Sequence, residues 1–296
     1  MGKTAFLFSG QGAQAPGMMK KYYDPVPGAR RVFDIADEIL GRSVSRLCFE
    51  GTQEELDLTH NTQPCVLAAD LAAYEVALAK GIEPDAVAGF SLGEYAALVA
   101  AGCLSVADAF PLVQLRADAM QEAVPVGKGA MAAIMKISSD EAEALCEEVD
   151  GYVVCANYNS PAQTVVSGET AAVEALVSLC KSRKIRSMVL PVSAPFHCEL
   201  MAFAAERLGE AIGALELHDP LIPIYMNVDA AMLSSVADLS AKMVAQAKSP
   251  VLWRQTLERM RDDGFTRYVE CGPGTTLTGF VKKTLNDVEI VSICDD

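Results

Sequence analysis

Residues 86–101 read AVAGFSLGEYAALVAA, and this stretch decides the fold class. The apolar residues before Gly89 are typical of the end of a buried strand, and those after Gly93 are strong helix formers. Strand, sharp turn and helix around a G-x-S-x-G pentapeptide make up the nucleophile-elbow arrangement. The glycines allow a tight turn that exposes Ser91 at the helix N-terminus, where free N–H groups, especially that of Leu92, can face a developing oxyanion. The pattern favours a nucleophilic serine over an ordinary serine in a small-residue turn.

Strands and helices alternate outside this stretch as well. Apolar runs at 4–8 and 266–269 read as buried strands, and the first of them leads into a glycine-rich loop that contains Gln11. Alternation of this kind predicts a parallel sheet with helices on both faces. Ligands of such sheets bind beyond the carboxyl ends of the strands, so Gln11, Ser91 and the turn at 272–274 are expected to converge.

One helix is predicted before the elbow and one after it. Residues 64–80 read as an amphipathic helix whose apolar stripe consists of Leu67, Leu71, Tyr74 and Leu78. A capping pattern at Ser105 opens a second helix that runs to Glu122. Pro111 lies inside this second pattern and is expected to kink or restart the helix.

A change in composition at 124–127 separates a second unit from the first. The patterns that follow are a strand, a helix, two strands, a helix and a strand, at 131–137, 139–148, 152–156, 164–166, 169–181 and 185–191. This βαββαβ order is the ferredoxin-like arrangement. We therefore expect an α/β protein with a parallel-sheet, hydrolase-like large subdomain at 1–124 and 196–296, and an inserted ferredoxin-like small subdomain at 125–195.

Composition excludes several classes of protein. The chain has 296 residues, of which 51% are hydrophobic, and its net charge of −15 argues against general nucleic-acid binding. No run reaches the length of a membrane span. The nine cysteines include no C-x-x-C motif, and the three histidines have no metal-ligand spacing. These features predict a cytoplasmic enzyme with reduced thiols, no metal and no cofactor.

A nucleophilic serine needs a base, and three histidines could supply it. His197 is favoured because it lies at a loop-to-helix transition directly after the expected small subdomain. His60 and His218 lie in polar turns. No acidic third member stands out, so a backbone carbonyl can be the group that orients the imidazole.

Several motifs in a fixed order identify a family. They are Phe8-x-Gly10-Gln11-Gly12-x-Gln14, Gly89-x-Ser91-Leu92-Gly93-Glu94, Arg116, Asn157-Tyr-Asn159-Ser-Pro161, Pro195-Phe196-His197, Gln246 with Pro250-Val251-x-Trp253, and Gly272-Pro-Gly274. Over essentially its whole length the chain resembles malonyl-CoA:acyl carrier protein transacylases and, more distantly, the acyltransferase domains of polyketide synthases.

The resemblance implies a role for each catalytic position. Ser91 would be the nucleophile and His197 its base. The backbone carbonyl of Gln246 would orient the imidazole. The backbone N–H groups of Gln11 and Leu92 would form the oxyanion hole.

The resemblance also implies a substrate site. Arg116 would hold the free carboxylate of the malonyl group as a bidentate pair. A lone helical arginine is usually solvated or structurally paired, so only the resemblance assigns this role. Asn157, Asn159, Phe196 and Met120 would belong to the same site, and the ring of Phe196 would crowd an α-methyl branch.

The implied activity is transfer of malonyl from malonyl-CoA to the phosphopantetheine thiol of acyl carrier protein, through a malonyl-serine, in fatty acid biosynthesis. The enzyme would be an acyl-carrier-protein S-malonyltransferase, expected to act as a monomer without nucleic acid or membrane. An acidic carrier requires a local basic site, for which Lys282 and Lys283 are favoured. The basic residues at 181–186 form a second cluster.

Other functions share parts of this pattern. A serine hydrolase would use the same Ser91 and His197 but admit water, and a carrier-binding module would use neither. A malonyl transferase that serves a polyketide or decarboxylase system would differ only in its acceptor. One departure from the family is Phe90, which stands where histidine is common, so no second imidazole flanks the serine.

Overall fold

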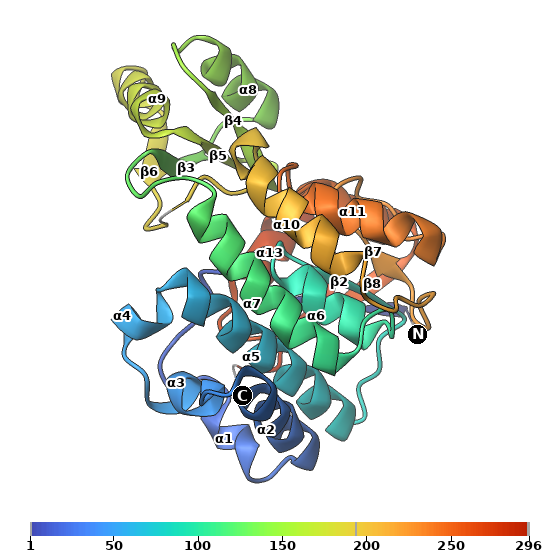
Figure 1. The fold of residues 1–296 in the computed structure, drawn as a ribbon. Coiled ribbons are helices and arrows are strands. Elements are labelled where there is room, and N and C mark those ends of the chain that lie inside the picture. The colour runs from blue at the N-terminus through green and yellow to red at the C-terminus, as the bar shows by residue number, and fades with distance from the viewer. Residues whose placement is uncertain (1, 193, 295–296) are drawn as a thin grey trace.

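A computed structural model describes residues 2–192 and 194–294. Within them the chain forms two sheets, one of five strands and one of four. Figure 1 shows the four-stranded sheet with helices α8 and α9 as a separate lobe above a larger, mainly helical body. The α/β fold with two subdomains that the sequence predicts is confirmed.

The larger sheet has the order β7-β2-β1-β8-β9 and is parallel throughout. Its strands are β1 (Lys3–Phe8), β2 (Ala86–Gly89), β7 (Ile224–Tyr225), β8 (Phe265–Cys271) and β9 (Glu289–Ser292). The central strand β1 is apolar at successive positions from Ala5 to Phe8 because helices bury both of its faces. Its register with β2 pairs Phe8 with Gly89, so the loops that follow the two strands begin at the same edge.

The helices of the larger body pack in two layers. One core joins Phe6 and Phe8 to α2 (Pro27–Leu40), α5 (Thr59–Ala79), α6 (Gly93–Ala100), α7 (Val106–Glu122) and α10 (Ala202–Ile212). The other joins Ala5 and Leu7 to α12 (Trp253–Asp262) and α13 (Thr276–Thr284). The remaining helices are α1 (Lys20–Tyr23), α3 (Val44–Glu50), α4 (Gln53–Leu56), α11 (Leu239–Gln246) and the 3₁₀ turns η1 (Glu199–Met201) and η2 (Val236–Asp238).

The smaller sheet has the order β4-β5-β3-β6 and is antiparallel. Its elements follow the predicted βαββαβ order: β3 (Gly129–Met135), α8 (Ser139–Glu147), β4 (Val153–Ser160), β5 (Gln163–Glu169), α9 (Thr170–Ser182) and β6 (Arg186–Val189). The two helices share one apolar core with one face of this sheet. Side chains of the opposite face, including Met131 and Val165, line a cavity that the larger body completes.

Helix α5 corrects the prediction of an amphipathic helix at 64–80. It begins at Thr59, contains Pro64, and is buried along most of its length and on nearly every side, because α2, α3, α6 and α7 surround it. Proline has no N–H to donate to the carbonyl four residues earlier. Here the Arg42 Nη2 donates to that carbonyl, the oxygen of His60, at 2.7 Å, which compensates for the missing helical bond.

Helix α7 begins as the sequence predicts and does not restart. Ser105 is its N-cap, and the hydroxyl accepts from the Asp108 amide at 3.0 Å. The helix continues through Pro111 to Glu122 without a break in its assignment. Arg116 is therefore carried on one continuous helix.

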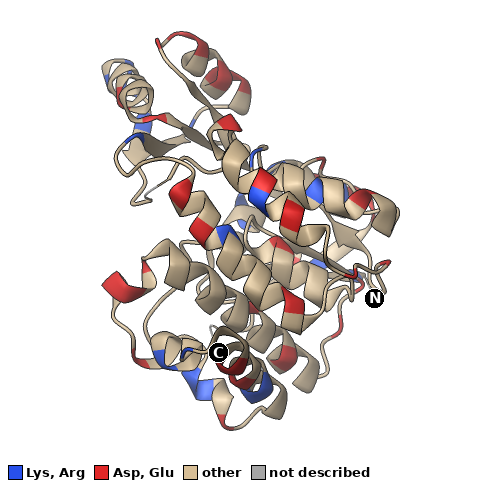
Figure 2. Cartoon of the chain, in the orientation of Figure 1, with Lys and Arg blue, Asp and Glu red and all other residues tan. Residues whose placement is uncertain are grey.

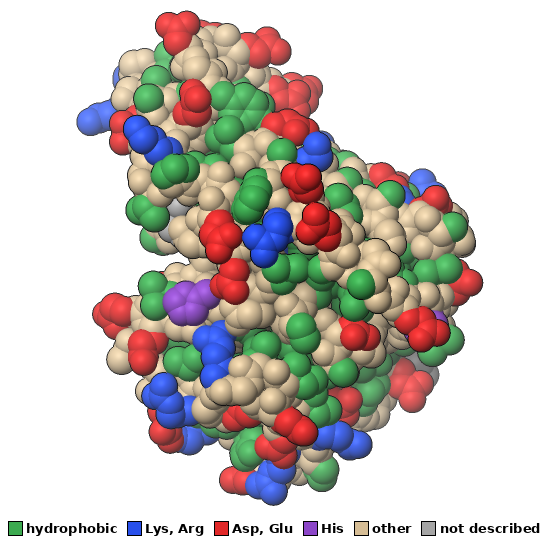
Figure 3. Space-filling view, viewed as in Figure 1, with side chains coloured by type: hydrophobic (Ala, Val, Ile, Leu, Met, Phe, Trp, Pro, Cys, Tyr) green, Lys and Arg blue, Asp and Glu red, His purple; other side chains and the backbone are tan. Residues whose placement is uncertain are grey.

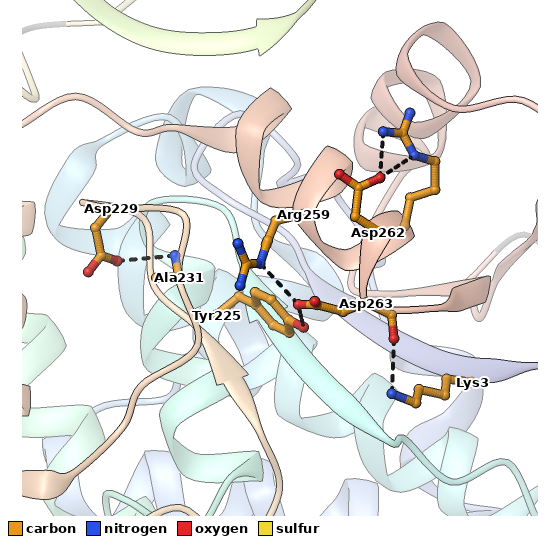
Figure 4. Close-up of polar contacts among 8 residues, drawn as sticks. Lys3, Tyr225, Asp229, Ala231, Arg259, Asp262 and Asp263 are labelled. Carbon is orange, nitrogen blue, oxygen red and sulfur yellow. Dashed lines mark hydrogen bonds and ion pairs between the residues drawn. The ribbon is translucent and has the colours of Figure 1, made fainter.

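A polar cluster connects strands of the larger sheet near the start of β8 (Figure 4). The Asp263 carboxylate, in the turn between α12 and β8, accepts from the Tyr225 hydroxyl at 2.7 Å and from Arg259 Nε at 3.2 Å. Its backbone carbonyl accepts from Lys3 Nζ at 2.9 Å. These contacts join the start of β8 to β1 and β7, at the edge opposite the loops that carry Gln11 and Ser91.

None of the helices that the structure describes is long and apolar enough to cross a membrane.

Candidate active site

The turn between β2 and α6 places Ser91 in a left-handed backbone conformation, with φ 53°. Glycine is required on both sides because the backbone passes too closely for a side chain. A Cβ on Gly89 would lie 2.0 Å from the carbonyl of Gly93, and a Cβ on Gly93 would lie 2.3 Å from the Phe8 oxygen. The positive φ of Ser91 is a strained conformation for a residue other than glycine, and such strain is characteristic of functional sites. The strand-turn-helix geometry predicted for the elbow is present.

His197 lies within hydrogen-bonding distance of the serine. The Ser91 Oγ is 2.6 Å from His197 Nε2, and His197 Nδ1 is 2.9 Å from the backbone oxygen of Gln246. A carbonyl oxygen can only accept, so Nδ1 carries the proton and Nε2 is free to accept the serine proton. The structure therefore brings together the serine, the histidine and the orienting carbonyl that the resemblance implies.

The imidazole is buried and is held in its neutral form. Burial, and secondarily the nearby positive charge of Arg116, lowers the pKa of His197 from 6.5 to about 4. A neutral imidazole is the form that can take a proton from Ser91.

Arg116 lies beside the pair, on the side of Ser91 away from the solvent. It is only 2% exposed. Its Nη2 donates to Ser91 Oγ and to the Gln246 side-chain oxygen, each at 3.3 Å. Nε has no partner, and among the described residues no carboxylate forms an ion pair with this guanidinium. Burial lowers the pKa of Arg116, and the neighbouring Tyr95 and Glu94 partly offset this effect.

Gln63 is a site residue that the sequence analysis missed. It lies on α5, is fully buried, and its side-chain oxygen accepts from Arg116 Nη1 at 2.9 Å. Its Nε2 reaches Gln11 Oε1 at 3.4 Å and Met120 Sδ at 3.9 Å. Nothing in the local sequence distinguishes this glutamine, because its importance comes from helix α7 lying alongside α5.

The proposed oxyanion amides lie on the two loops that leave β1 and β2. Gln11 is half-buried, and Leu92 is the N-cap residue of α6. Within the described part of the chain, neither backbone N–H donates to a protein acceptor. Neither amide is therefore engaged by another group of the described chain.

A cavity of about 230 Å³ opens above the serine, between the two lobes. Figure 3 shows an indentation where the lobes meet. Ser91, Gln11 and His197 line it from the larger body, together with Phe196 and Phe90. The Phe90 ring packs edge-on against Trp253, with the two ring centroids 5.5 Å apart. A histidine at this position would present a polar edge to the tryptophan.

Two asparagines reach the same cavity from β4 of the smaller sheet. Asn157 and Asn159 are both buried and line the wall. The Asn159 Oδ1 has no hydrogen-bond partner among the described residues, so it is open to a donor on a ligand. Met120 is fully buried beneath Gln63 and is not among the residues that line the cavity.

One of the two lysines proposed for docking, Lys283, borders a groove next to this cavity. Lys282 and Lys283 are exposed in the last turn of α13. Lys283, Lys136 and Arg186 line a groove of about 380 Å³ that has no acidic residue in its wall. Gln163 lines both this groove and the cavity, so the two are adjacent.

The other histidines and the cysteines lie elsewhere. His60 and His218 are exposed. All nine cysteines are free. Cys198 follows His197 directly, but its thiol donates to the Pro195 carbonyl at 3.2 Å and is buried. Among the described residues, no cluster of His, Cys, Asp or Glu could hold a metal ion.

The neutral state of His197 leads to a pH prediction. Reactivity should be present above its pKa of about 4 and lost as the pH falls through that value. We expect the rate at which phenylmethylsulfonyl fluoride modifies Ser91 to stay level down to about pH 5 and to fall below it. A rate that is already half-maximal near pH 6.5, the ordinary imidazole value, would contradict this.

The Arg116→Ala variant tests how much the charge of Arg116 contributes to the lowered pKa of His197. Removal of the positive charge should raise the pKa of His197, so the acid limb of the same profile should move to higher pH. Arg207→Ala is the control, because it removes a partly exposed charge on α10 that pairs with Glu122. The control should leave the acid limb in place.

A parallel α/β sheet with a serine–histidine pair at its carboxyl edge is typical of enzymes that transfer acyl groups through a serine. Residues 5–295 match the family model for the acyl transferase domain. The chain belongs to the family of malonyl CoA-acyl carrier protein transacylases.

Individual relatives agree over the full length. The malonyl CoA-acyl carrier protein transacylase of Bacillus subtilis (strain 168) is 44% identical over 299 residues, which cover 100% of this chain and 94% of the relative. A solved acyl-carrier-protein S-malonyltransferase from Burkholderia pseudomallei has a TM-score of 0.96 at 41% identity, with 99% and 97% of the two chains covered. A malonyl-transacylase solved in complex with a type II polyketide acyl-carrier protein has a TM-score of 0.95 at 38% identity, with 99% and 96% covered.

Proposed function

We propose that this protein transfers the malonyl group from malonyl-CoA to the phosphopantetheine thiol of acyl carrier protein, in fatty acid biosynthesis. The observation that carries the proposal is the buried Arg116, which lacks a carboxylate partner and lies 3.3 Å from the hydroxyl of Ser91. A substrate with a free carboxylate would complete this site, and a buried guanidinium that keeps no such partner is strongly penalised.

In the first half-reaction Ser91 is acylated. His197 Nε2 takes the hydroxyl proton while Oγ bonds to the thioester carbonyl carbon. The carbon–sulfur bond then breaks, and the thiolate of CoA leaves with the proton from the imidazolium. The backbone N–H groups of Gln11 and Leu92 would stabilise the oxyanion between these steps.

In the second half-reaction the acceptor thiol gives its proton to His197. The sulfur attacks the malonyl-serine ester, the bond to Oγ breaks, and the proton returns to Ser91. The donor and the acceptor use the same cavity in turn, so the kinetics should be ping-pong. Asn157, Asn159 and Phe196 line that cavity and would position the acyl group and the thiol arm.

The smaller lobe, which we assign to residues 125–195, would close one side of the cleft. The face of its sheet that lines the cavity carries apolar side chains, including Met131, Val165 and Met188. Apolar walls disfavour water at the acyl-enzyme, which supports transfer over hydrolysis.

The alternative that the enzyme is a hydrolase is tested by presenting malonyl-CoA with and without holo acyl carrier protein. Malonyl should appear on the carrier and only slowly as free malonate; malonate formed at the same rate in both reactions would favour the hydrolase.

The acceptor would dock at Lys282 and Lys283. A local basic site is needed because acyl carrier protein is acidic and this chain carries a net charge of −15. Figure 2 shows acidic and basic residues mixed over both lobes, with no single basic face in that view. Lys283 borders the groove that adjoins the cavity, so the thiol arm of a carrier held there would have a short path to Ser91.

Reversal of both charges, Lys282→Glu with Lys283→Glu, should raise the KM for carrier protein and leave malonyl loading unchanged. Each unfavourable exposed contact costs on the order of 1 kcal/mol, so the two together should raise the KM by about 30-fold. The control is Lys181→Glu with Lys184→Glu, an equal charge change at exposed positions on the second basic cluster. Equal effects on loading and on carrier transfer, or a larger effect of the control pair, would refute this docking site.

We also propose that the enzyme is a cytoplasmic monomer that binds no nucleic acid. The acidic net charge supports the absence of nucleic-acid binding, and the free thiols of all nine cysteines support a reducing compartment.

A further inference from the structure

Asn227 contacts the backbone of Ser91 and takes no part in the proton transfers of the two half-reactions. It follows β7 and is fully buried. Its Oδ1 accepts from the Ser91 backbone N–H at 2.8 Å, and its Nδ2 donates to the Gly89 carbonyl at 2.7 Å. A single amide side chain therefore bridges the last residue of β2 and the nucleophile.

The backbone of Asn227 is itself fixed at both ends. Its N–H donates to the Glu94 carboxyl at 2.6 Å, and its carbonyl accepts from the Leu252 N–H at 3.0 Å. Glu94 is buried at the start of α6, and burial raises its pKa to about 8. Asn227 is thus held between the elbow helix and the segment that precedes α12, with little freedom to move.

Gln246 completes the arrangement on the other side of the serine. Its Nε2 donates to the Ser91 backbone carbonyl at 2.7 Å and lies 3.5 Å from Asn227 Oδ1. The backbone oxygen of the same glutamine accepts from His197. Two amide side chains therefore hold the N–H and the C=O of Ser91, and one of them belongs to the residue that orients the base.

Ser91 needs such support because its backbone is strained. A non-glycine residue at positive φ costs about 1–3 kcal/mol and persists only where its surroundings determine it. If the serine relaxed, its Oγ would leave the position 2.6 Å from His197 Nε2. Loss of alignment on the order of 1 Å is enough to cost about 100-fold in rate.

We infer that Asn227 is a positioning residue for acyl transfer: its side chain fixes the strained elbow so that the Ser91 hydroxyl stays aligned with His197. Asn227 is not among the residues that line the cavity, so it acts through the elbow and not by contact with the substrate. The inference rests on the proposed chemistry at Ser91, and its test uses a reagent as well as the substrate so that the two can fail separately.

The first test is the Asn227→Ala variant. We expect kcat for transfer and the rate of Ser91 modification by phenylmethylsulfonyl fluoride to fall together by roughly 10- to 100-fold, with the KM for malonyl-CoA nearly unchanged. Asn61→Ala is the matched control. Asn61 is also buried and uses both ends of its amide, toward Arg42 and the Glu55 carbonyl, but it lies away from the serine. The control should lower the melting temperature and leave both rates near wild type.

The second test is Asn227→Asp, which keeps the side-chain volume if the alanine variant does not fold. Its carboxyl can accept from Ser91 N–H in either state but can donate to the Gly89 carbonyl only when protonated. The modification rate relative to wild type should therefore rise as the pH falls from about 8 to about 6. Glu94 faces this residue in both proteins, and its negative charge would raise the pKa of the introduced carboxyl further.

A folded Asn227→Ala protein with wild-type rates would overturn the inference, as would an Asn227→Asp ratio that does not change with pH. If wild type reacts with the sulfonyl fluoride but forms no malonyl ester, the proposed function fails while the comparison of variants still stands.

Discussion

Replacement of Ser91 by alanine is expected to abolish both halves of the reaction. Loss of a serine nucleophile costs on the order of 10⁴-fold or more in kcat, and here no neighbouring group can take its place. Phe90 precedes it, and the thiol of Cys198 is buried and donates to the Pro195 carbonyl. The measurement is CoA release from malonyl-CoA, followed separately from malonyl transfer to holo acyl carrier protein.

Ser167→Ala is the control for this prediction. Ser167 is a fully buried serine near the site whose hydroxyl contacts Cys198 Sγ at 3.6 Å and not the histidine. The control should keep both activities. Substantial CoA release by a folded Ser91→Ala protein would mean that another group is the nucleophile.

Replacement of Arg116 by alanine is expected to change which acyl group the enzyme accepts. Truncating one partner of a buried charge pair costs about 2–5 kcal/mol, so kcat/KM for malonyl-CoA should fall by roughly 30- to 4,000-fold. For acetyl-CoA the wild-type site leaves the guanidinium without its partner, and removal of that penalty of about 1–3 kcal/mol should improve this substrate. The measurement is kcat/KM for the two thioesters side by side.

Arg116→Lys separates the charge from the geometry of this contact. Lysine keeps the positive charge but cannot form the bidentate pair, so it should recover only part of the malonyl activity. Gln63, whose side-chain oxygen accepts from Arg116 Nη1, should remain in place in this variant. If the alanine variant lost activity toward malonyl-CoA and acetyl-CoA equally, Arg116 would be a structural residue and not the carboxylate site.

The elbow could be predicted from sequence because its information is local. Strand, glycine, serine, glycine and helix follow one another within sixteen residues, and each glycine is required by a close backbone approach. The order of elements in the smaller lobe could be predicted for the same reason, since each strand and helix has its own period. The convergence of Gln11 with Ser91 followed from one topological rule, that parallel strands end at a common edge.

Contacts between distant segments could not be predicted in this way. Asn227 and Gln63 meet the serine and the arginine across separations of 136 and 53 residues. The role of Gln246 as orienting group came only from the family resemblance, because a backbone carbonyl has no side-chain signature. Helix α5 was misread as amphipathic because surrounding helices bury its polar positions as well.

No element is predicted in the segment 20–56, although it contains α1 to α4 and carries recognisable helix signals. Thr52 and Glu55 form a capping box, and Pro27 occupies the first position of α2; both are recognised starts of helices. These helices matter for function only indirectly, since they cover α5 and thereby fix Gln63.

The most direct test of the account is the intact mass of the protein after brief exposure to malonyl-CoA without an acceptor, followed by peptide mapping. We predict one malonyl adduct on the peptide that contains Ser91, much less adduct from acetyl-CoA, and loss of the adduct when holo acyl carrier protein is added. CoA release with malonate and no adduct, or an adduct on any other residue, would contradict the central claim that Ser91 carries the acyl group between the two thiols.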